Sequence, residues 1–205
     1  MSTANTYVQD LFKGLPQGTN ATSRIGNVVN VKYVKGNITL TANTVSNSAS
    51  GYENAQYGEA VLDDVDSTLI QYLRTTFRVV IVRDLQVNSA ASEVTWNDVF
   101  SNLNGTSGVH SELNVANMGR FSVLMDKLVY LDADNPQKTM PFIFRNLGRV
   151  RYNGPQADGA QSALTDSGLY IVWACLSAGV SGTTAAGNTS SKGVNVNSRM
   201  CFTDC

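Results

Sequence analysis

The stretch TTFRVVIVRD, Thr75–Asp84, decides the fold class of this chain. Side chains alternate along a strand, so Phe77, Val79 and Ile81 share one face if the stretch is extended. Arg78 lies on the other face with further valines. A run of β-branched residues favours a strand over a helix. We expect the purely apolar face to fill a core, and the mixed face to meet a neighbouring subunit, a covering segment or nucleic acid.

Stretches of strand character recur on both sides of this one, and long loops rich in Gly, Ser, Thr and Asn separate them. In Val28–Leu40, Tyr33 is expected on the same face as Val29 and Val31. After Gly36 the apolar residues change to the other alternating positions, which predicts a bulge or bend at Gly36. A short helix is expected at Thr95–Leu103, where Thr95 and Asp98 make a capping pair. The expected strands are Val28–Leu40, Arg120–Asp132, Met140–Tyr152, Leu169–Leu176 and Val194–Phe202. This pattern predicts an all-β, Greek-key sandwich with short inserted helices.

The N-terminal stretch has a different apolar spacing. Val8, Leu11, Phe12 and Leu15 recur at helical intervals and predict a short amphipathic helix. We therefore divide the chain into an arm, residues 1–22, and a sandwich domain, residues 23–205. The first residues are polar and do not resemble a secretory signal peptide.

The composition restricts the possible partners. The chain has 205 residues, is 42% hydrophobic and only 15% charged, and carries a formal net charge of -1. No overall basic field attracts nucleic acid. The low charged fraction fits a protein that buries surface against its own copies, because the cores of interfaces are poor in charge. Three free cysteines are expected, with a bond between Cys201 and Cys205 as the alternative.

Catalytic constellations are absent from the sequence, so we expect no enzyme. The single histidine, His110, lies in a loop without a nucleophile motif around it. The densest acidic group is Asp63, Asp64 and Asp66, which could hold calcium through hard oxygen ligands or form a solvated turn.

One basic stripe stands out. Arg145, Arg149 and Arg151 share a parity opposite Phe142 and Phe144. Such a stripe could contact phosphates without reading their sequence, or pair with carboxylates across an interface. The sequence favours neither alternative.

The order of motifs points to a known family. Ser23–Asn27, the strand FRVVIVRD, the helix around Asn97–Phe100 and the strand RFSVLMDK follow one another. Over roughly Arg24–Tyr152 the chain resembles the single jelly-roll coat proteins of small icosahedral viruses. The resemblance is to the satellite tobacco necrosis virus type and to the capsids of circular single-stranded DNA viruses.

The resemblance implies an eight-stranded antiparallel jelly roll that assembles into a T=1-type shell of roughly 60 copies. The shell would enclose a single-stranded nucleic acid genome, and calcium would be possible at subunit interfaces. It further implies location in the virion and a host receptor that the sequence does not identify. We expect no membrane insertion, because no apolar run approaches the roughly 20 residues needed to span a bilayer. Genome contacts would fall to Lys13, Arg24, Arg145, Arg149 and Arg151.

The chain departs from that family at its start. The family has an N-terminal arm dense in Arg and Lys, whereas residues 1–22 hold Lys13 alone. A truncation, packaging through the inner surface of the shell, or a relative that does not package nucleic acid would each explain this. We expect the N-terminal helix on the inner side.

A second reading is a lectin-like jelly-roll module that binds sugars. Its stacking surfaces would come from Trp96, Tyr52, Tyr57, Tyr130 and Tyr152.

Overall fold

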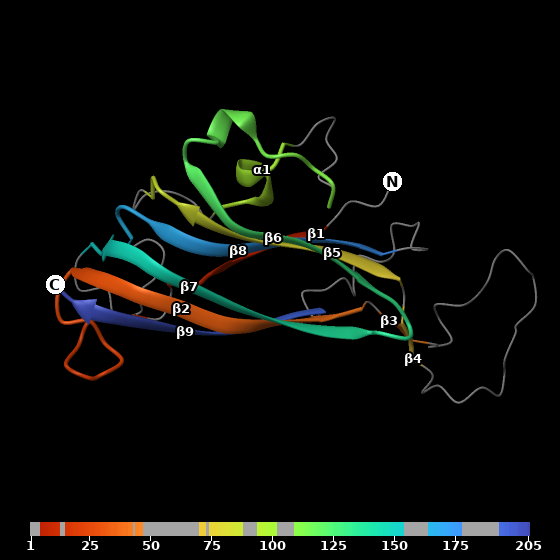
Figure 1. Cartoon of the computed structure of the whole chain (residues 1–205), viewed down its shortest axis with the longest axis horizontal. Coiled ribbons are helices and arrows are strands. Elements are labelled where there is room, and N and C mark those ends of the chain that lie inside the picture. The colour runs from red at the N-terminus through yellow and green to blue at the C-terminus, as the bar shows by residue number, and fades with distance from the viewer. Residues whose placement is uncertain are drawn as a thin grey trace, which may run out of the picture.

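The computed structural model describes residues 5–12, 15–42, 44–46, 70–72, 74–87, 94–101, 109–153, 164–177 and 193–205. These residues form an all-β sandwich of two antiparallel sheets (Figure 1). One sheet has the order β1-β8-β5-β6 and the other β7-β2-β9, while β3 and β4 form a separate pair. The strands are β1 (Asn5–Asp10), β2 (Val28–Thr41), β3 (Thr44–Ser46), β4 (Ile70–Tyr72), β5 (Thr75–Asp84), β6 (Phe121–Leu131), β7 (Gln137–Arg151), β8 (Gly168–Ser177) and β9 (Val194–Asp204).

The strand count corrects one expectation. Within the described ranges the two principal sheets hold seven strands, whereas eight were expected. The expected strands are otherwise present, and β5 has the bounds expected from the sequence, Thr75–Asp84. The sandwich core lies between the sheets, where Phe77, Val79 and Ile81 pack against residues of β2 and β7.

The prediction of an N-terminal helix is wrong. Asn5–Asp10 is strand β1, which pairs antiparallel with β8 so that Val8 lies opposite Val172. After the strand, Leu11 and Phe12 turn into the core, and the Asp10 carboxylate accepts a hydrogen bond from the Phe12 amide at 2.7 Å. A helix this short is marginal alone, whereas a strand gains backbone partners along β8. The described part of residues 1–22 therefore belongs to the sandwich and is not a separate arm.

The parity change in β2 lies earlier than expected. A register shift falls between Val31 and Tyr33, so Val34 rather than Tyr33 faces the core. Gly36 has a different role. A Cβ there would lie 2.2 Å from the Asn197 carbonyl oxygen and 2.9 Å from the Phe142 ring, so only glycine allows this close packing.

The outer face of the four-stranded sheet is covered by a segment we call the cap, residues 94–101 and 109–120 (Figure 1). It contains the helix α1 (Trp96–Val99) and the 3-10 turn η2 (Val115–Asn117). Thr95 begins α1 as expected, because the Asp98 carboxylate accepts the Thr95 backbone N–H at 2.7 Å. A second apolar cluster forms between cap and sheet from Val80, Val82, Val94, Trp96, Val99, Phe100, Val109, Phe121, Tyr170, Val172 and Ala174.

Arg78 fixes the cap to the sheet. Its guanidinium forms a two-pronged ion pair with Asp126 on β6, at 3.0 Å and 2.6 Å. It also donates to the carbonyl oxygens of Val109 and Ser111 and lies 4.2 Å from the centroid of the Phe100 ring. A covering segment is one of the three neighbours expected for the mixed face of β5, and the cap supplies it.

Candidate nucleic-acid interface

Charge is divided unequally between the two sheets. Seven of the 15 lysines and arginines of the chain lie in β2, β7 and β9, where Asp204 is the only acid. These are Lys32, Lys35, Lys138, Arg145, Arg149, Arg151 and Arg199, and they leave a formal charge of 7 − 1 = +6. The strands of the other sheet carry Arg78, Arg83 and Lys127 against Asp10, Asp84 and Asp126, which sum to zero. One layer of a nearly neutral protein is therefore strongly basic.

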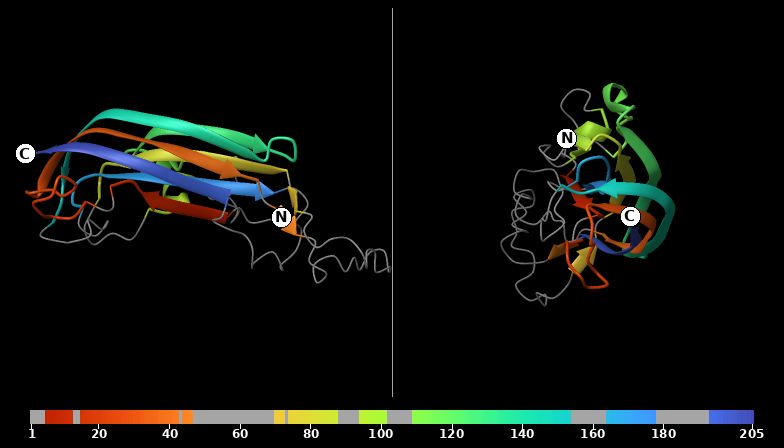
Figure 2. Two further views of the ribbon diagram at one scale, coloured as in Figure 1. Left: turned by 90° about the horizontal axis from the view of Figure 1, so that it is seen from below. Right: turned by 90° about the vertical axis from the view of Figure 1, so that its left-hand side faces the viewer.

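Six of these cations share the outer side of the three-stranded sheet, which we call the basic face. They are Lys32, Lys35, Arg145, Arg149, Arg151 and Arg199, and all six are exposed. Figure 2 shows β9, β2 and β7 lying side by side in the view from below. From the Arg151 end, the rows across the face are Arg151 with Val28, Arg149 with Asn30 and Thr203, Arg145 with Tyr33 and Cys201, and Ile143 with Lys35 and Arg199.

Two irregular residues keep the arginines of β7 on one side. Asn146 and Gly148 have positive φ angles of 56° and 78°. Between Tyr33 and Val31 of β2, the partners on β7 run from Arg145 to Gly148, so β7 has one extra residue there. Glycine adopts such angles without steric cost, and asparagine tolerates them better than most residues.

The cations of the basic face have no described acidic partner. No carboxylate in the described ranges lies within ion-pair distance of any of the six. The two ion pairs found among the described residues, Arg78–Asp126 and Arg120–Asp84, both belong to the other sheet and its cap. Unpaired cations at this density repel one another, so the face favours a polyanion over a neutral ligand.

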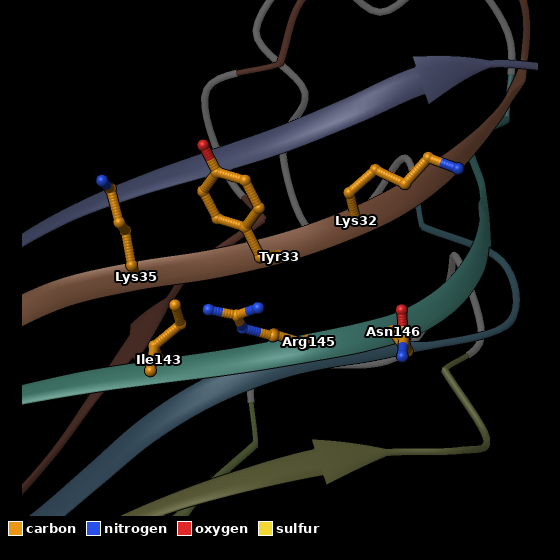
Figure 3. A pocket seen from close by; sticks show the side chains of 6 residues that line it. All are labelled: Lys32, Tyr33, Lys35, Ile143, Arg145 and Asn146. Carbon is orange, nitrogen blue, oxygen red and sulfur yellow. The ribbon is translucent and has the colours of Figure 1, made fainter.

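A pocket of about 360 Å³ opens on this face. Its lining comes from β2 and β7 and combines three cations with an aromatic ring, an aliphatic side chain and an amide. Figure 3 shows the Tyr33 ring projecting from β2 and the Arg145 side chain extending from β7 toward it. The lining residues are Lys32, Tyr33, Lys35, Ile143, Arg145 and Asn146.

The structure places three of the expected phosphate-binding residues together. Arg145, Arg149 and Arg151 lie exposed on one face, opposite the inward-facing Phe142 and Phe144. Their role in binding stays a prediction, and so does the alternative of carboxylate partners across an interface.

The structure contradicts the expectation that Arg24 contacts nucleic acid. It is 0% exposed and cannot reach a nucleic acid. Its guanidinium donates to the carbonyl oxygen of Gly26 at 2.8 Å and to Asn27 Oδ1 at 3.0 Å, and lies 4.6 Å from the Tyr152 ring centroid. Arg24 therefore organises the loop before β2.

Other candidates lie outside the described residues. These are Lys13 and the possible calcium ligands Asp63, Asp64 and Asp66. Among the described residues, no group of three or more His, Cys, Asp or Glu is arranged to hold a metal ion. The three cysteines are free, as expected.

Three members of the basic face were missed from the sequence. Sequence spacing assigned no role to Lys32, Lys35 or Arg199. They meet Arg145 only because β2 pairs with both β7 and β9. The available signal was the shortage of acids in all three strands.

The described members of the stacking set proposed for a sugar site do not lie together. Trp96 and Tyr152 are buried, and Tyr130 lies exposed on β6 of the other sheet. Tyr52 and Tyr57 lie outside the described residues.

No protein-family model matches the chain, and no curated protein matches it significantly. Within the described ranges, no helix has the length and apolar character needed to cross a bilayer.

Proposed function

We propose that this chain is a viral coat protein that assembles into a small icosahedral shell around single-stranded nucleic acid. The observation that carries the proposal is the basic face, six exposed cations with no carboxylate in reach among the described residues. Phosphate contacts of this kind supply affinity without sequence preference. The basic face is then the surface that meets the genome.

The order of strand pairing supports a jelly roll. β5 pairs with β6, β2 with β7, and β1 with β8, so each pair encloses the one before it along the chain. A long antiparallel hairpin wound into a two-layered sandwich gives such nesting, and it is the connectivity of jelly rolls. The resemblance of the strands FRVVIVRD and RFSVLMDK to those of coat proteins points the same way.

The exposed apolar side chains support assembly. Tyr130 is 66% exposed on β6, and Leu128 and Leu176 are exposed beside it on the uncapped end of the same sheet face. The cap exposes Val115 and Met118. Contacts between copies would remove this surface from water, which the low charged fraction of the chain also favours.

The basic face offers a reason for the sparse charge of residues 1–22. A sheet whose strands carry a formal charge of +6 supplies the cations that the family places on an N-terminal arm. Of the three explanations for the missing arm, packaging through the inner surface fits this charge distribution best.

Nucleic acid content tests this role. We expect particles of the full chain, purified from cells, to contain nucleic acid as judged by ultraviolet absorbance. The double variant Arg149→Gln/Arg151→Gln removes two of the six cations, so it should lower the nucleic acid per chain by roughly one third. The matched control Arg74→Gln/Lys127→Gln removes two exposed cations elsewhere.

The control should package as the parent does. Equal loss in both double variants would show that overall charge matters and the basic face does not. Particles that form without nucleic acid, or a chain that stays monomeric, would contradict the proposal.

A further inference from the structure

We propose that the pocket around Tyr33 receives one unpaired base of the bound strand, stacked on the Tyr33 ring and flanked by phosphates held by the surrounding cations. The inference rests on the proposed function, because it specifies how the basic face recognises its ligand. It makes this face selective for single-stranded nucleic acid over a polyanion without bases.

The pocket combines charge with apolar surface at one level of the sheet. Tyr33 is half-buried and lies opposite Arg145, while Ile143, in the next row, is 50% exposed. An exposed isoleucine beside an aromatic ring among cations does not improve phosphate binding. It does provide a surface for the flat face of a base.

The backbone is built to expose these side chains together. In a regular strand neighbouring side chains point to opposite faces. Here both Lys32 and Tyr33 line the pocket, because the register shift lies between Val31 and Tyr33. Arg145 and Asn146 do the same on β7, where Asn146 has a φ of 56°. Irregularities on two adjacent strands at one level add Lys32 and Asn146 to the side chains that line the pocket. Bulges commonly re-aim side chains at functional sites.

The chemistry of this set suits a nucleotide. Bases stack on aromatic rings whatever their identity, and grooves that bind single strands combine such rings with cations. The Lys35 ammonium lies 5.8 Å from the centroid of the Tyr33 ring. Lys35 and Arg145 flank the Tyr33 side chain, and Lys32 extends away from it along β2 (Figure 3). The three cations are thus placed to meet the phosphates on either side of a stacked base. A duplex keeps its bases in its own stack and cannot offer one.

An abasic strand separates base stacking from phosphate binding. Fluorescence anisotropy would compare a labelled deoxythymidine strand of roughly 12 nucleotides with an abasic strand of equal length and charge. The full chain is used at concentrations where sedimentation shows separate subunits. We expect the thymidine strand to bind about tenfold more tightly, since one stacked base contributes on this order.

Substitutions at Tyr33 then locate the effect. Tyr33→Leu should lower affinity for the thymidine strand about tenfold and leave the abasic strand unchanged, whereas Tyr33→Phe keeps the ring and the parent's affinity. The matched control is Tyr130→Leu, which removes an exposed tyrosine from the opposite sheet and should change neither value. Circular dichroism verifies that each variant is folded.

Different results would contradict phosphate binding by the basic face and base binding in the pocket around Tyr33. If the parent binds neither strand, the basic face is not a nucleic-acid interface and the proposed function falls with it. If the parent binds both strands equally, or if Tyr33→Leu does not reduce the preference for the thymidine strand, the base pocket is overturned while phosphate binding stands.

Discussion

The arginines of this chain differ in what surrounds their guanidinium groups. Arg24 is enclosed by the loop before β2 and by Tyr152, Arg78 is held by Asp126 and the cap, and Arg145 extends into solvent. Sequence spacing identified the exposed stripe of Arg145, Arg149 and Arg151, although Asn146 and Gly148 interrupt the alternation of β7 between the first two of them. It failed for Arg24, because burial there depends on contacts between a loop and the distant residue Tyr152.

Tyr152 leads to a prediction about alkaline pH. Burial raises the pKa of its phenol well above the ordinary value of 10, and nearby Asp10 adds to the effect. The folded state therefore keeps the proton when the unfolded state has lost it, and the free energy of unfolding should fall as the pH rises above about 10. Tyr152→Phe removes this contribution.

Urea unfolding of the parent and Tyr152→Phe at neutral pH and above pH ~10 measures the effect. At neutral pH the variant should match the parent or gain up to about 1 kcal/mol, because the Tyr152 hydroxyl is buried without a hydrogen-bond partner in the described residues. Above pH ~10 the variant should be the more stable of the two. An identical pH dependence in both proteins would show that the phenol titrates normally.

At the scale of elements, β5 behaves as its alternation indicates. Phe77, Val79 and Ile81 fill the core, while Val80 and Val82 pack under the cap. The periodicity established that both faces are used. It did not identify what covers the second face. The cap consists of residues 94–101 and 109–120, and alternation within β5 carries no information about which distant residues pack on it. Helical spacing misled in β1 because the same apolar residues also serve a strand followed by a turn into the core.

Arg78 leads to a prediction about the cap. Arg78→Glu places a carboxylate against Asp126 and against the carbonyl oxygens of Val109 and Ser111. We expect the free energy of unfolding to fall by about 3 kcal/mol. Amide exchange in residues 109–120 should accelerate, because the cap is no longer anchored to the sheet.

Hydrogen-exchange mass spectrometry measures the loosening of the cap. The control is Lys127→Glu, the same charge reversal at an exposed position next to Asp126, which should alter stability by no more than about 0.5 kcal/mol. Unchanged exchange in the Arg78 variant would mean that apolar packing alone holds the cap.

At the scale of the whole molecule, one sheet carries the cap (Figure 1) and its strands are neutral, whereas no described segment caps the other sheet and its strands are basic. Composition concealed this division, because the net charge of -1 averages the two layers and the loops. Three of the six cations of the basic face, those on β7, could be predicted from the sequence as a stripe on one strand. The rest depends on which strands pair, and pairing between β2, β7 and β9 joins residues that are far apart in the sequence.

The salt dependence of nucleic acid binding should follow from the basic face. Removing one cation that binds a phosphate flattens the slope of log affinity against log salt by about 0.7 for a single strand. The double variant Arg149→Gln/Arg151→Gln should therefore flatten the slope by about 1.4. The control Arg74→Gln/Lys127→Gln should leave it unchanged. An equal slope in all three proteins would show that these arginines do not bind phosphate.

The orientation of the subunit in an assembled particle tests the central claim most directly. Electron cryomicroscopy of particles formed by the full chain would show which sheet faces inward. We predict closed shells with β7, β2 and β9 lining the interior, and nucleic acid density against Tyr33 and Arg145. Shells that present the basic face outward, or a chain that forms no particles, would contradict the account.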